Sequence, residues 1–337
     1  MIVTVVCPCR NEVSHIDRFL RALTQQKATE FDLDILVADG ESDDGTADLL
    51  GAWLAKEPRM KIVPNPGRIA STGLNAALRI ACGDVVVRMD VHTTYAEDYV
   101  AQCVNTLKQT GAACVGGPWL AKGSSLRQSA IAAAFSSRFG SGGAKSRRAD
   151  YTGPVDTVYL GAWWRKDLIA LGGFDEELVR NQDDELCLRI TRSGGTVWQS
   201  SAIRSSYTPR DSFGALWRQF YQYGYWKGAV MRKHRLPSSQ RQLAPSVFIL
   251  TLLIFGLAAL FSPLAGLLAM GLFTAYLTAA TLAAVSATKS YDPANLALVV
   301  LSFASMHFAY GLGLFHSFVD FFVLRRKTTS RMSELTR

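Results

Sequence analysis

The chain has few features of a secreted or a nucleic-acid-binding protein. Its six cysteines include no Cys-x-x-Cys pair and mostly lie in apolar segments, which indicates reduced, buried thiols. The apolar run Ile2–Val6 is too short for a signal peptide, so none is expected there. No helix-turn-helix pattern or RNA-binding aromatic motif stands out. The net charge of +8 therefore favours another anionic partner.

The basic residues point to a membrane surface. They concentrate between Arg204 and Arg241 and again at Arg325–Lys327, on either side of an apolar region. Three segments in that region approach or exceed the ~20 apolar residues of a bilayer span. They are Pro245–Phe261, Leu264–Ala287 and Ala294–Leu324.

The first two apolar segments are expected to form a tight hairpin. The third is longer than a span requires, so it is expected to tilt, to break near Gly311–Gly313, or to dip into the bilayer and return. The positive-inside rule places Lys227–Arg241 in the cytoplasm, and it leaves the side of the C-terminal tail open.

Before the apolar region, short apolar runs alternate with helical patterns, which predicts a parallel, doubly wound sheet covered on both faces. Strands are expected at Val3–Cys7, Leu33–Ala38, Lys61–Val63, Val85–Met89, Ala113–Gly117 and Thr157–Leu160. Helices are expected at Glu12–Leu23, Thr46–Leu54, Ser71–Ala81, Tyr95–Gln109, Asp183–Thr191 and Arg210–Lys233. A mobile loop is expected at Gly140–Arg148.

Asp90 and His92 follow the strand expected at Val85–Met89. In open α/β sheets, ligands bind beyond the carboxyl ends of the strands. Alternate residues of an extended segment point the same way, so this spacing lets both side chains reach one cation. An ordinary surface loop is the alternative.

Two further polar stretches lie at strand-to-helix turns, Pro8–Glu12 and Asp39–Thr46. A carboxylate there can accept the imide N–H of uracil, and glycines let a base approach the backbone. Helix capping by Ser42 or Asp44 is the alternative. We expect Asp39 to bind a ligand and Asp44 mainly to cap.

Three other groups are candidates for chemistry. Arg68, in a group with Asn75, is either a phosphate ligand or a solvated loop residue. The acids Asp183–Glu185 supply either a general base or charges that suit a helix N-terminus. A lipid-proximal platform for a diphosphate, or interfacial anchoring alone, is expected from Arg210, Gln219, Gln222, Trp226 and Lys227. For this long helix, the core of a soluble domain is a further alternative.

In this order the motifs resemble those of family-2 glycosyltransferases of the GT-A fold. The resemblance spans roughly residues 3–233 and is closest to membrane-anchored exopolysaccharide glucosyltransferases of the succinoglycan type, the ExoA-like branch. The residues that carry it are Pro8–Glu12, Asp39–Thr46, Arg88–His92, Gly172–Glu176, Asn181–Leu186 and Gln219–Lys227.

The resemblance implies a role for each motif. Nucleotide-sugar contacts are implied for Pro8, Arg10, Glu12, Asp39, Arg68, Asn75 and Asp90. The family's Asp-x-Asp motif reads Asp90-Val91-His92 and would bind Mn²⁺ or Mg²⁺ through Asp90 and His92. Asp183 would be the catalytic base, with Asp184 as the second candidate. The arginine of the processive Gln-x-x-Arg-Trp motif is missing before Trp226, which argues against processive synthesis.

The implied protein is an inverting enzyme of the bacterial inner membrane, multi-pass, with a cytoplasmic catalytic domain. It would transfer a sugar, with glucose expected, from a UDP-sugar to a polyprenyl-diphosphate-linked glycan in exopolysaccharide biosynthesis. The alternatives are a polyprenyl-phosphate glycosyltransferase, a non-catalytic nucleotide-sugar-binding scaffold and a nucleotidyltransferase. The expected organisation is a GT-A domain at residues 1–208, an interfacial helix region at 209–242, a membrane domain at 243–325 and a basic tail at 326–337.

Overall fold

The computed structural model describes residues 1–237 and 239–326. The chain forms two compact units. The sheet unit comprises Met1–Leu120 and Arg148–Tyr207, and the helical unit comprises Ala121–Arg147 and the chain from Thr208 onward. The predicted basic tail, apart from Arg326, lies outside the described residues.

The sheet unit contains an eight-stranded mixed sheet with the order β3-β2-β1-β4-β8-β6-β9-β7. Its strands are β1 (Ile2–Cys9), β2 (Asp32–Asp39), β3 (Met60–Pro64), β4 (Val85–Arg88), β6 (Cys114–Gly117), β7 (Gly153–Pro154), β8 (Tyr159–Trp164) and β9 (Val197–Gln199). A separate two-stranded antiparallel sheet pairs β5 (Thr93–Tyr95) with β10 (Ser205–Tyr207).

The predicted parallel pairing is correct for β3-β2-β1-β4 and for β6 with β9. It is wrong for β8 and β7, whose pairings are antiparallel. Strand β8 runs antiparallel to both β4 and β6. Between β6 and β8, the segment Ala121–Arg147 belongs to the helical unit. Parallel neighbours need a crossover connection, usually a helix packed on the sheet. The segment before β8 does not supply one, and β8 is antiparallel to both neighbours.

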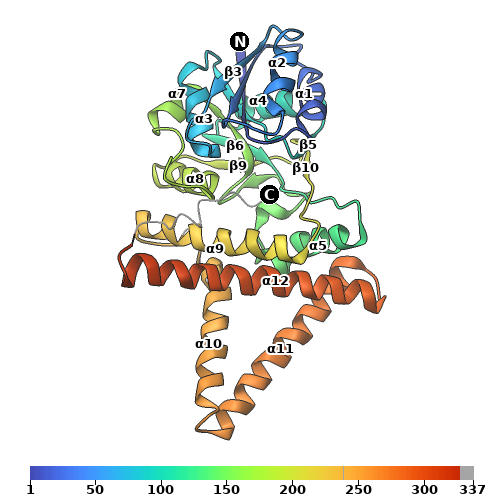
Figure 1. Ribbon diagram of the computed structural model, residues 1–337, viewed down its shortest axis with the longest axis vertical. Coiled ribbons are helices and arrows are strands. Elements are labelled where there is room, and N and C mark those ends of the chain that lie inside the picture. Colours follow the sequence, from blue (N-terminus) through green and yellow to red (C-terminus); the bar gives the residue numbers. More distant parts are fainter. Residues whose placement is uncertain (238, 327–337) are drawn as a thin grey trace. The chain divides into compact units, whose positions relative to one another are not determined.

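Helices cover both faces of the sheet, as predicted (Figure 1). They are α1 (Ile16–Thr24), α2 (Thr46–Leu54) and α4 (Tyr99–Thr110) on one face, and α3 (Ala70–Ile80), α7 (Arg165–Ala170) and α8 (Gln182–Arg192) on the other. Alternate residues of β1 enter two different cores, with Val5 beside Ile16 in one core and Val6 beside Leu74 in the other. A strand buried on both faces needs a continuous apolar run, and this explains why β1 could be predicted from the sequence.

The register of the parallel strands brings three turns to one edge of the sheet. Cys9 at the end of β1 is paired with Asp39 at the end of β2. Val6 of β1 is paired with Arg88, the last residue of β4. The residues that follow these strands therefore emerge at the same edge.

The helical unit contains α5 (Leu126–Ser136), α6 (Arg138–Ser141), α9 (Phe213–His234), α10 (Ala244–Ala258), α11 (Pro263–Thr288) and α12 (Pro293–Phe318). In place of the predicted loop at Gly140–Arg148, the structure has the end of α6 and a 3-10 turn, Lys145–Arg147. The guanidinium of Arg147 lies 4.9 Å from the ring centroid of Phe135, which fixes this turn against α5.

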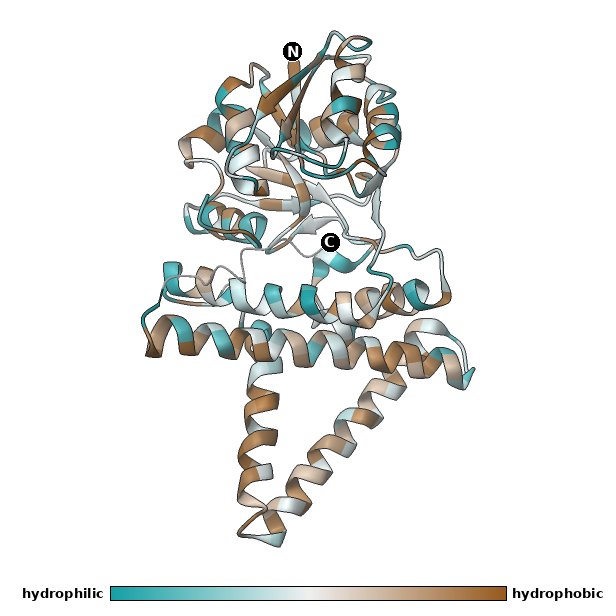
Figure 2. Ribbon diagram, viewed as in Figure 1, coloured by the Kyte–Doolittle hydropathy of each residue, from teal (hydrophilic) through white to brown (hydrophobic). Residues whose placement is uncertain are grey.

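The apolar region forms three helices that are long and apolar enough to cross a membrane: Gln240–Ala258, Pro263–Thr288 and Pro293–Val323. The first two form a hairpin, as predicted, and most of the hairpin's residues are hydrophobic (Figure 2). Only 6% and 17% of their most apolar windows are buried, against 44% for the third. The third helix is therefore packed against other parts of the protein to a greater extent than the first two.

Helix α12 lies alongside α9 (Figure 1) and does not break at Gly311–Gly313. A Cβ atom at Gly224 of α9 would overlap the carbonyl oxygen of Tyr310, and one at Gly313 would overlap that of Tyr221. These glycines let the two backbones approach closely, as small residues do between membrane helices. The predicted break is therefore wrong, because the glycines serve packing.

Candidate active site

The turns after β1 and β2 are joined by Asn11. Its amide Nδ2 donates to Asp43 Oδ1 at 2.8 Å, and Asp43 N donates to Asn11 Oδ1 at 3.0 Å. Asn11 N also donates to Ser42 Oγ at 2.8 Å. Asn11 adopts a φ of 53°, which asparagine tolerates better than most residues. The two polar turns form one structure.

Three of the predicted nucleotide contacts lie next to one another around Gly40. Asp39 precedes it, and its carboxylate accepts Ser42 Oγ–H at 2.6 Å. A Cβ atom at Gly40 would lie 3.1 Å from Cβ of Arg10 and 3.3 Å from Cα of Arg68. Pro8 pairs with Ala38 in the preceding register. The structure thus brings Arg10, Asp39 and Arg68 together around Gly40, with Pro8 near the end of the neighbouring strand β1.

Asp44 binds the N-terminus of α2, as predicted for a capping residue, although it lies one residue before the N-cap residue Gly45. Its carboxylate accepts Thr46 N–H at 3.0 Å and Val13 N–H at 3.1 Å, while Gly45, at a φ of 96°, is the N-cap residue. Burial alone would raise the pKa of Asp44, but the hydrogen bonds from Thr46 and Val13 outweigh it and lower that pKa.

Arg68 and Asn75 both have protein partners. Arg68 Nε donates to Glu41 Oε2 at 2.6 Å, so its charge is offset at a half-exposed position. Asn75 exchanges two hydrogen bonds with the backbone of Phe174, at 2.8 and 2.9 Å, and donates to Glu176 at 2.8 Å. In this arrangement Asn75 fixes the segment that precedes α8.

Arg88, to which the sequence assigned no role, is the centre of the site. It is only 6% exposed, and its Nε and Nη2 donate to Asp90 Oδ1 and Oδ2, each at 2.8 Å. Burial would lower the pKa of Arg88, but the charges of Asp90 and Asp183 outweigh it and raise that pKa. Asp90 and Asp183 are thus electrostatic neighbours of one buried cation. A charged residue inside the apolar run Val85–Met89 was the available signal.

Asp90 and His92 have different protein partners, although their spacing predicted that both would face one cation. The chain turns after β4, and Thr93 N donates to Asp90 O at 3.1 Å. Tyr95 closes this turn, because its hydroxyl accepts Asp90 N–H at 2.6 Å and lies 3.0 Å from Asp90 O. The segment is therefore not extended, and the argument from alternate residues fails. Asp90 is bound to Arg88, whereas His92 is directed to Glu12.

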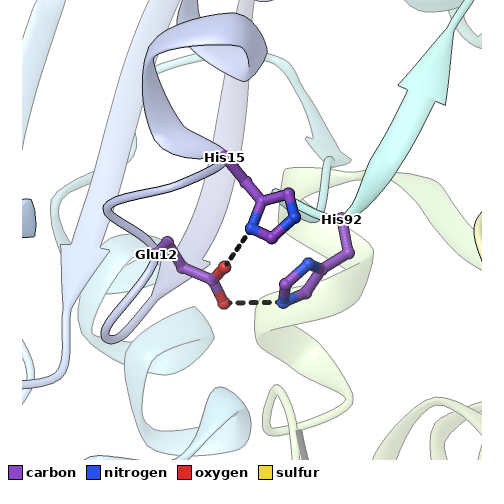
Figure 3. Close-up of side chains that lie close together, drawn as sticks. All are labelled: Glu12, His15 and His92. Atoms are coloured by element: carbon purple, nitrogen blue, oxygen red, sulfur yellow. Dashed lines mark ion pairs between the residues drawn. The ribbon is translucent and has the colours of Figure 1, made fainter. Parts of the chain in front are cut away.

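Glu12, His15 and His92 form a cluster whose donor atoms all lie within 4.8 Å of one another (Figure 3). His92 Nε2 lies 2.9 Å from Glu12 Oε1, and His15 Nδ1 lies 3.8 Å from Glu12 Oε2. A carboxylate and two imidazoles are a suitable donor set for a divalent ion. Glu12, expected to contact the nucleotide, thus faces the predicted metal ligand His92.

Asp183 and Asp184 occupy the first turn of α8, as predicted. Asp184 N donates to Asp183 Oδ1 at 2.9 Å, which fixes one oxygen of that carboxylate. The next acid, Glu185, is fully buried and bound to Arg189 at 2.9 Å. Arg189 in turn donates to Gly173 O at 2.6 Å. Glu185 therefore holds α8 to the preceding loop.

The comparison with known proteins decides the family. Residues 4–168 match the description "Glycosyl transferase family 2". The succinoglycan biosynthesis protein ExoA of Rhizobium meliloti (strain 1021) is 32% identical over 243 residues, which cover 72% of this chain and 73% of that protein. The chain belongs to glycosyl transferase family 2.

Two other similarities agree with this assignment. A dolichyl N-acetyl-alpha-D-glucosaminyl phosphate 3-beta-D-2,3-diacetamido-2,3-dideoxy-beta-D-glucuronosyltransferase of Methanococcus voltae is 26% identical over 243 residues (68% of this chain, 74% of that protein). The mannosyltransferase PcManGT from Pyrobaculum calidifontis, solved with GDP-Man and Mn²⁺, has a TM-score of 0.63 and 21% identity, covering 92% of this chain and 86% of that chain. This second likeness shows that the glycosyltransferase has a GT-A fold.

In the helical unit of the glycosyltransferase, the predicted platform residues are mostly buried. Gln219, Gln222, Trp226 and Lys227 are each no more than 5% exposed. Gln219 Nε2 donates to Tyr223 OH at 3.0 Å. Arg210, just before α9, is partly exposed. These four side chains therefore lie mostly inside the helical unit, where α9 packs against α12.

Proposed function

We propose that this glycosyltransferase moves a sugar, with glucose expected, from a UDP-sugar to a polyprenyl-diphosphate-linked glycan in exopolysaccharide biosynthesis. The observation that carries the proposal is Arg88, a buried cation at the end of β4 that binds Asp90 and also interacts electrostatically with Asp183. The similarity to ExoA, named for succinoglycan biosynthesis, supports the product class.

The nucleotide is assigned to the joined turns after β1 and β2. Pro8, Arg10 and Asp39 would hold the uridine, with the Asp39 carboxylate accepting the imide N–H of the base. Arg68 would exchange its Glu41 partner for a phosphate, which a guanidinium fork matches equally well. Asn75 would act by holding the loop before α8 in place.

The residues fit a divalent ion, for which Mn²⁺ or Mg²⁺ is expected. Such an ion, when bound, stabilises negative charge on a departing diphosphate. Asp90 and His92 are the proposed ligands from the Asp-x-His motif, with Glu12 adjacent to His92. Arg88 holds Asp90 in a single orientation through both of its oxygens and partly neutralises it.

Asp183 is the proposed catalytic base. It would take the proton of the acceptor hydroxyl at a carboxylate oxygen while the hydroxyl oxygen attacks the anomeric carbon. The bond from that carbon to the diphosphate oxygen breaks, UDP leaves with the electron pair, and the configuration is inverted. The bond from Asp184 N to Asp183 Oδ1 limits rotation of the carboxylate. Asp184 itself is the second candidate for the base.

For the membrane, we propose that α10 and α11 cross the bilayer and that α12 lies with α9 at its cytoplasmic surface. The packing of α12 along α9 supports this placement. Asp320, in the π-helical turn Val319–Val323 that follows α12, accepts Tyr225 OH of α9 at 3.0 Å. Two crossings also put the basic ends of α9 and α12 on one side, as the positive-inside rule favours.

We propose that the protein is a multi-pass protein of the bacterial inner membrane with its sheet unit in the cytoplasm. The residues proposed to bind the acceptor diphosphate, Arg210, Gln219, Gln222, Trp226 and Lys227, then belong to the cytoplasmic surface region. Lys227 and Arg210 would supply positive charge, and the two glutamines would donate hydrogen bonds.

A screen of UDP-sugars with extracted lipid-linked acceptors tests the function. Wild type should release UDP in a divalent-ion-dependent reaction, and Asp183→Asn should not. UDP release with polyprenyl phosphate alone would favour a polyprenyl-phosphate glycosyltransferase. Nucleotide-sugar binding without UDP release from any acceptor would favour a scaffold, and release of pyrophosphate would indicate a nucleotidyltransferase.

A further inference from the structure

A buried carboxylate faces two histidines at the edge of the sheet (Figure 3). The Glu12 side chain is 7% exposed, and its two oxygens are directed to different rings, Oε1 to His92 and Oε2 to His15. The two rings approach edge to face, with centroids 4.8 Å apart. His15 and His92 are 40% and 43% exposed, so solvent reaches the cluster from one side.

The backbone holds the three side chains in this arrangement. Glu12 N donates to Thr46 Oγ1 at 2.7 Å. Glu12 O accepts N–H bonds from His15 and Ile16, each at 2.8 Å, and this turn just before α1 brings Glu12 and His15 close together. His92 comes from the closed turn after β4. A fixed carboxylate with two partly exposed imidazoles is a preorganised donor set.

The chemistry of these donors selects a class of ion. Imidazole nitrogen suits zinc, copper, iron, cobalt and nickel, whereas magnesium prefers oxygen ligands and keeps much of its water. A carboxylate with two histidines leaves coordination positions open, as in catalytic metal sites that accept a substrate oxygen. A direct measurement of metal binding distinguishes a metal site from hydrogen bonds alone between Glu12 and the two histidines.

We infer that Glu12, His15 and His92 bind one first-row transition-metal ion in the absence of nucleotide. In this nucleotide-free state the ligands are one carboxylate oxygen of Glu12 and one nitrogen each of His15 and His92. Asp90 and His92 are the ligands proposed for the enzyme with the sugar donor bound. The inference rests on the proposed function only in expecting this ion to serve the sugar donor, while the binding itself does not depend on that function. It makes His15 a metal ligand, which the Asp-x-His motif does not include.

The test uses the full chain in detergent, stripped of metal by a chelator and kept free of nucleotide. Titration with Co²⁺ should give visible absorption bands that saturate at one ion per chain, and Zn²⁺ should displace it. Mg²⁺ should not compete at equal concentration. His15→Gln and Glu12→Gln should each weaken Co²⁺ binding by at least about tenfold.

His234→Gln is the matched control, because it removes a histidine of α9 outside the cluster and should bind Co²⁺ like wild type. His15 is partly exposed, so His15→Gln is expected to fold even if Glu12→Gln does not. Unchanged Co²⁺ affinity in His15→Gln, or no saturable binding in wild type, would overturn the inference.

UDP release distinguishes the two proposals. If wild type transfers sugar but binds no ion without nucleotide, the metal site is wrong and the proposed function stands. If Co²⁺ binding requires Glu12 and His15 but no UDP-sugar is turned over, the proposed function is wrong and the metal site stands.

Discussion

Arg88 binds both carboxylate oxygens of Asp90 from inside the sheet unit, at 2.8 Å each. The side chain of Arg88 is 7% exposed and that of Asp90 is 28% exposed, so the pair is shielded on one side and open on the other. Such a pair can fix the orientation of a carboxylate that also has to meet a ligand. The charge of Asp183 also acts on Arg88 and helps to raise its pKa.

Arg88→Met should destabilise the protein, because Asp90 then loses both charged donors. We expect a loss of about 2–4 kcal/mol in the free energy of unfolding, since Asp90 keeps some access to water. Denaturant titration of the full chain in detergent measures this loss in the free energy of unfolding. Arg79→Met is the control. Arg79 pairs with Glu176 at 3.6 Å but is 67% exposed, so this change should cost less than about 1 kcal/mol. Equal losses in the two variants would contradict the prediction.

Asp183→Asn should lower kcat by about 10²–10⁴-fold, the range expected for loss of a general base. Binding of the UDP-sugar should change little, because the nucleotide is assigned to other turns. Initial rates of UDP release at saturating acceptor, together with donor affinity by calorimetry, separate the two effects. Asp184→Asn, one residue further along the same helix, is the matched control and should retain most of the activity. The reverse order of effects would make Asp184 the base.

The sequence predicted the sheet unit well where short-range patterns decide it. Thr46–Leu54 matches α2 at both ends, and the β-branched run at Val85 matches β4 within one residue. It did not predict the direction of β8, because strand pairing depends on contacts with residues far away in the chain. Nor could hydropathy distinguish α12 from a lipid-facing helix. The spacing Gly224-x-x-x-Gly228 in α9 was the available signal for close packing.

The sequence predicted where several residues of the candidate site lie, but it predicted less well which residues they contact. Asp39 and Asp183 lie at strand and helix ends, as expected from sequence. The partners of His92 were missed, because the chain turns at Asp90 instead of continuing as a strand. The contact between His15 and Glu12 could have been predicted, because the i, i+3 spacing in a helix expected to begin at Glu12 brings both side chains to one face.

Gly224→Ala tests the packing of α9 against α12. The new methyl group would overlap the carbonyl oxygen of Tyr310, and such overpacking typically costs about 1–3 kcal/mol. The better helix propensity of alanine returns only about 1 kcal/mol, so we expect a net loss of stability. Gly214→Ala, near the start of the same helix, meets no atom within 4 Å and should be neutral or stabilising. Thermal unfolding in detergent compares the two, and equal melting temperatures would show that the helices are less closely packed.

The membrane topology can be tested with single cysteines in a Cys82→Ser background, because the other five native cysteines are buried. Phe261, at the turn between α10 and α11, is 90% exposed, and Tyr291, just before α12, is 82% exposed. Arg325, just after the π-helical turn Val319–Val323, is also exposed.

If only α10 and α11 cross the bilayer, a membrane-impermeant maleimide should label Phe261→Cys in intact spheroplasts. Tyr291→Cys and Arg325→Cys should then be labelled only after the membrane is permeabilised, because α12 begins and ends on the cytoplasmic side. Labelling of Arg325→Cys from outside, with Tyr291→Cys protected, would mean that α12 crosses the bilayer. Protection of Phe261→Cys would mean that the hairpin enters the membrane without crossing it.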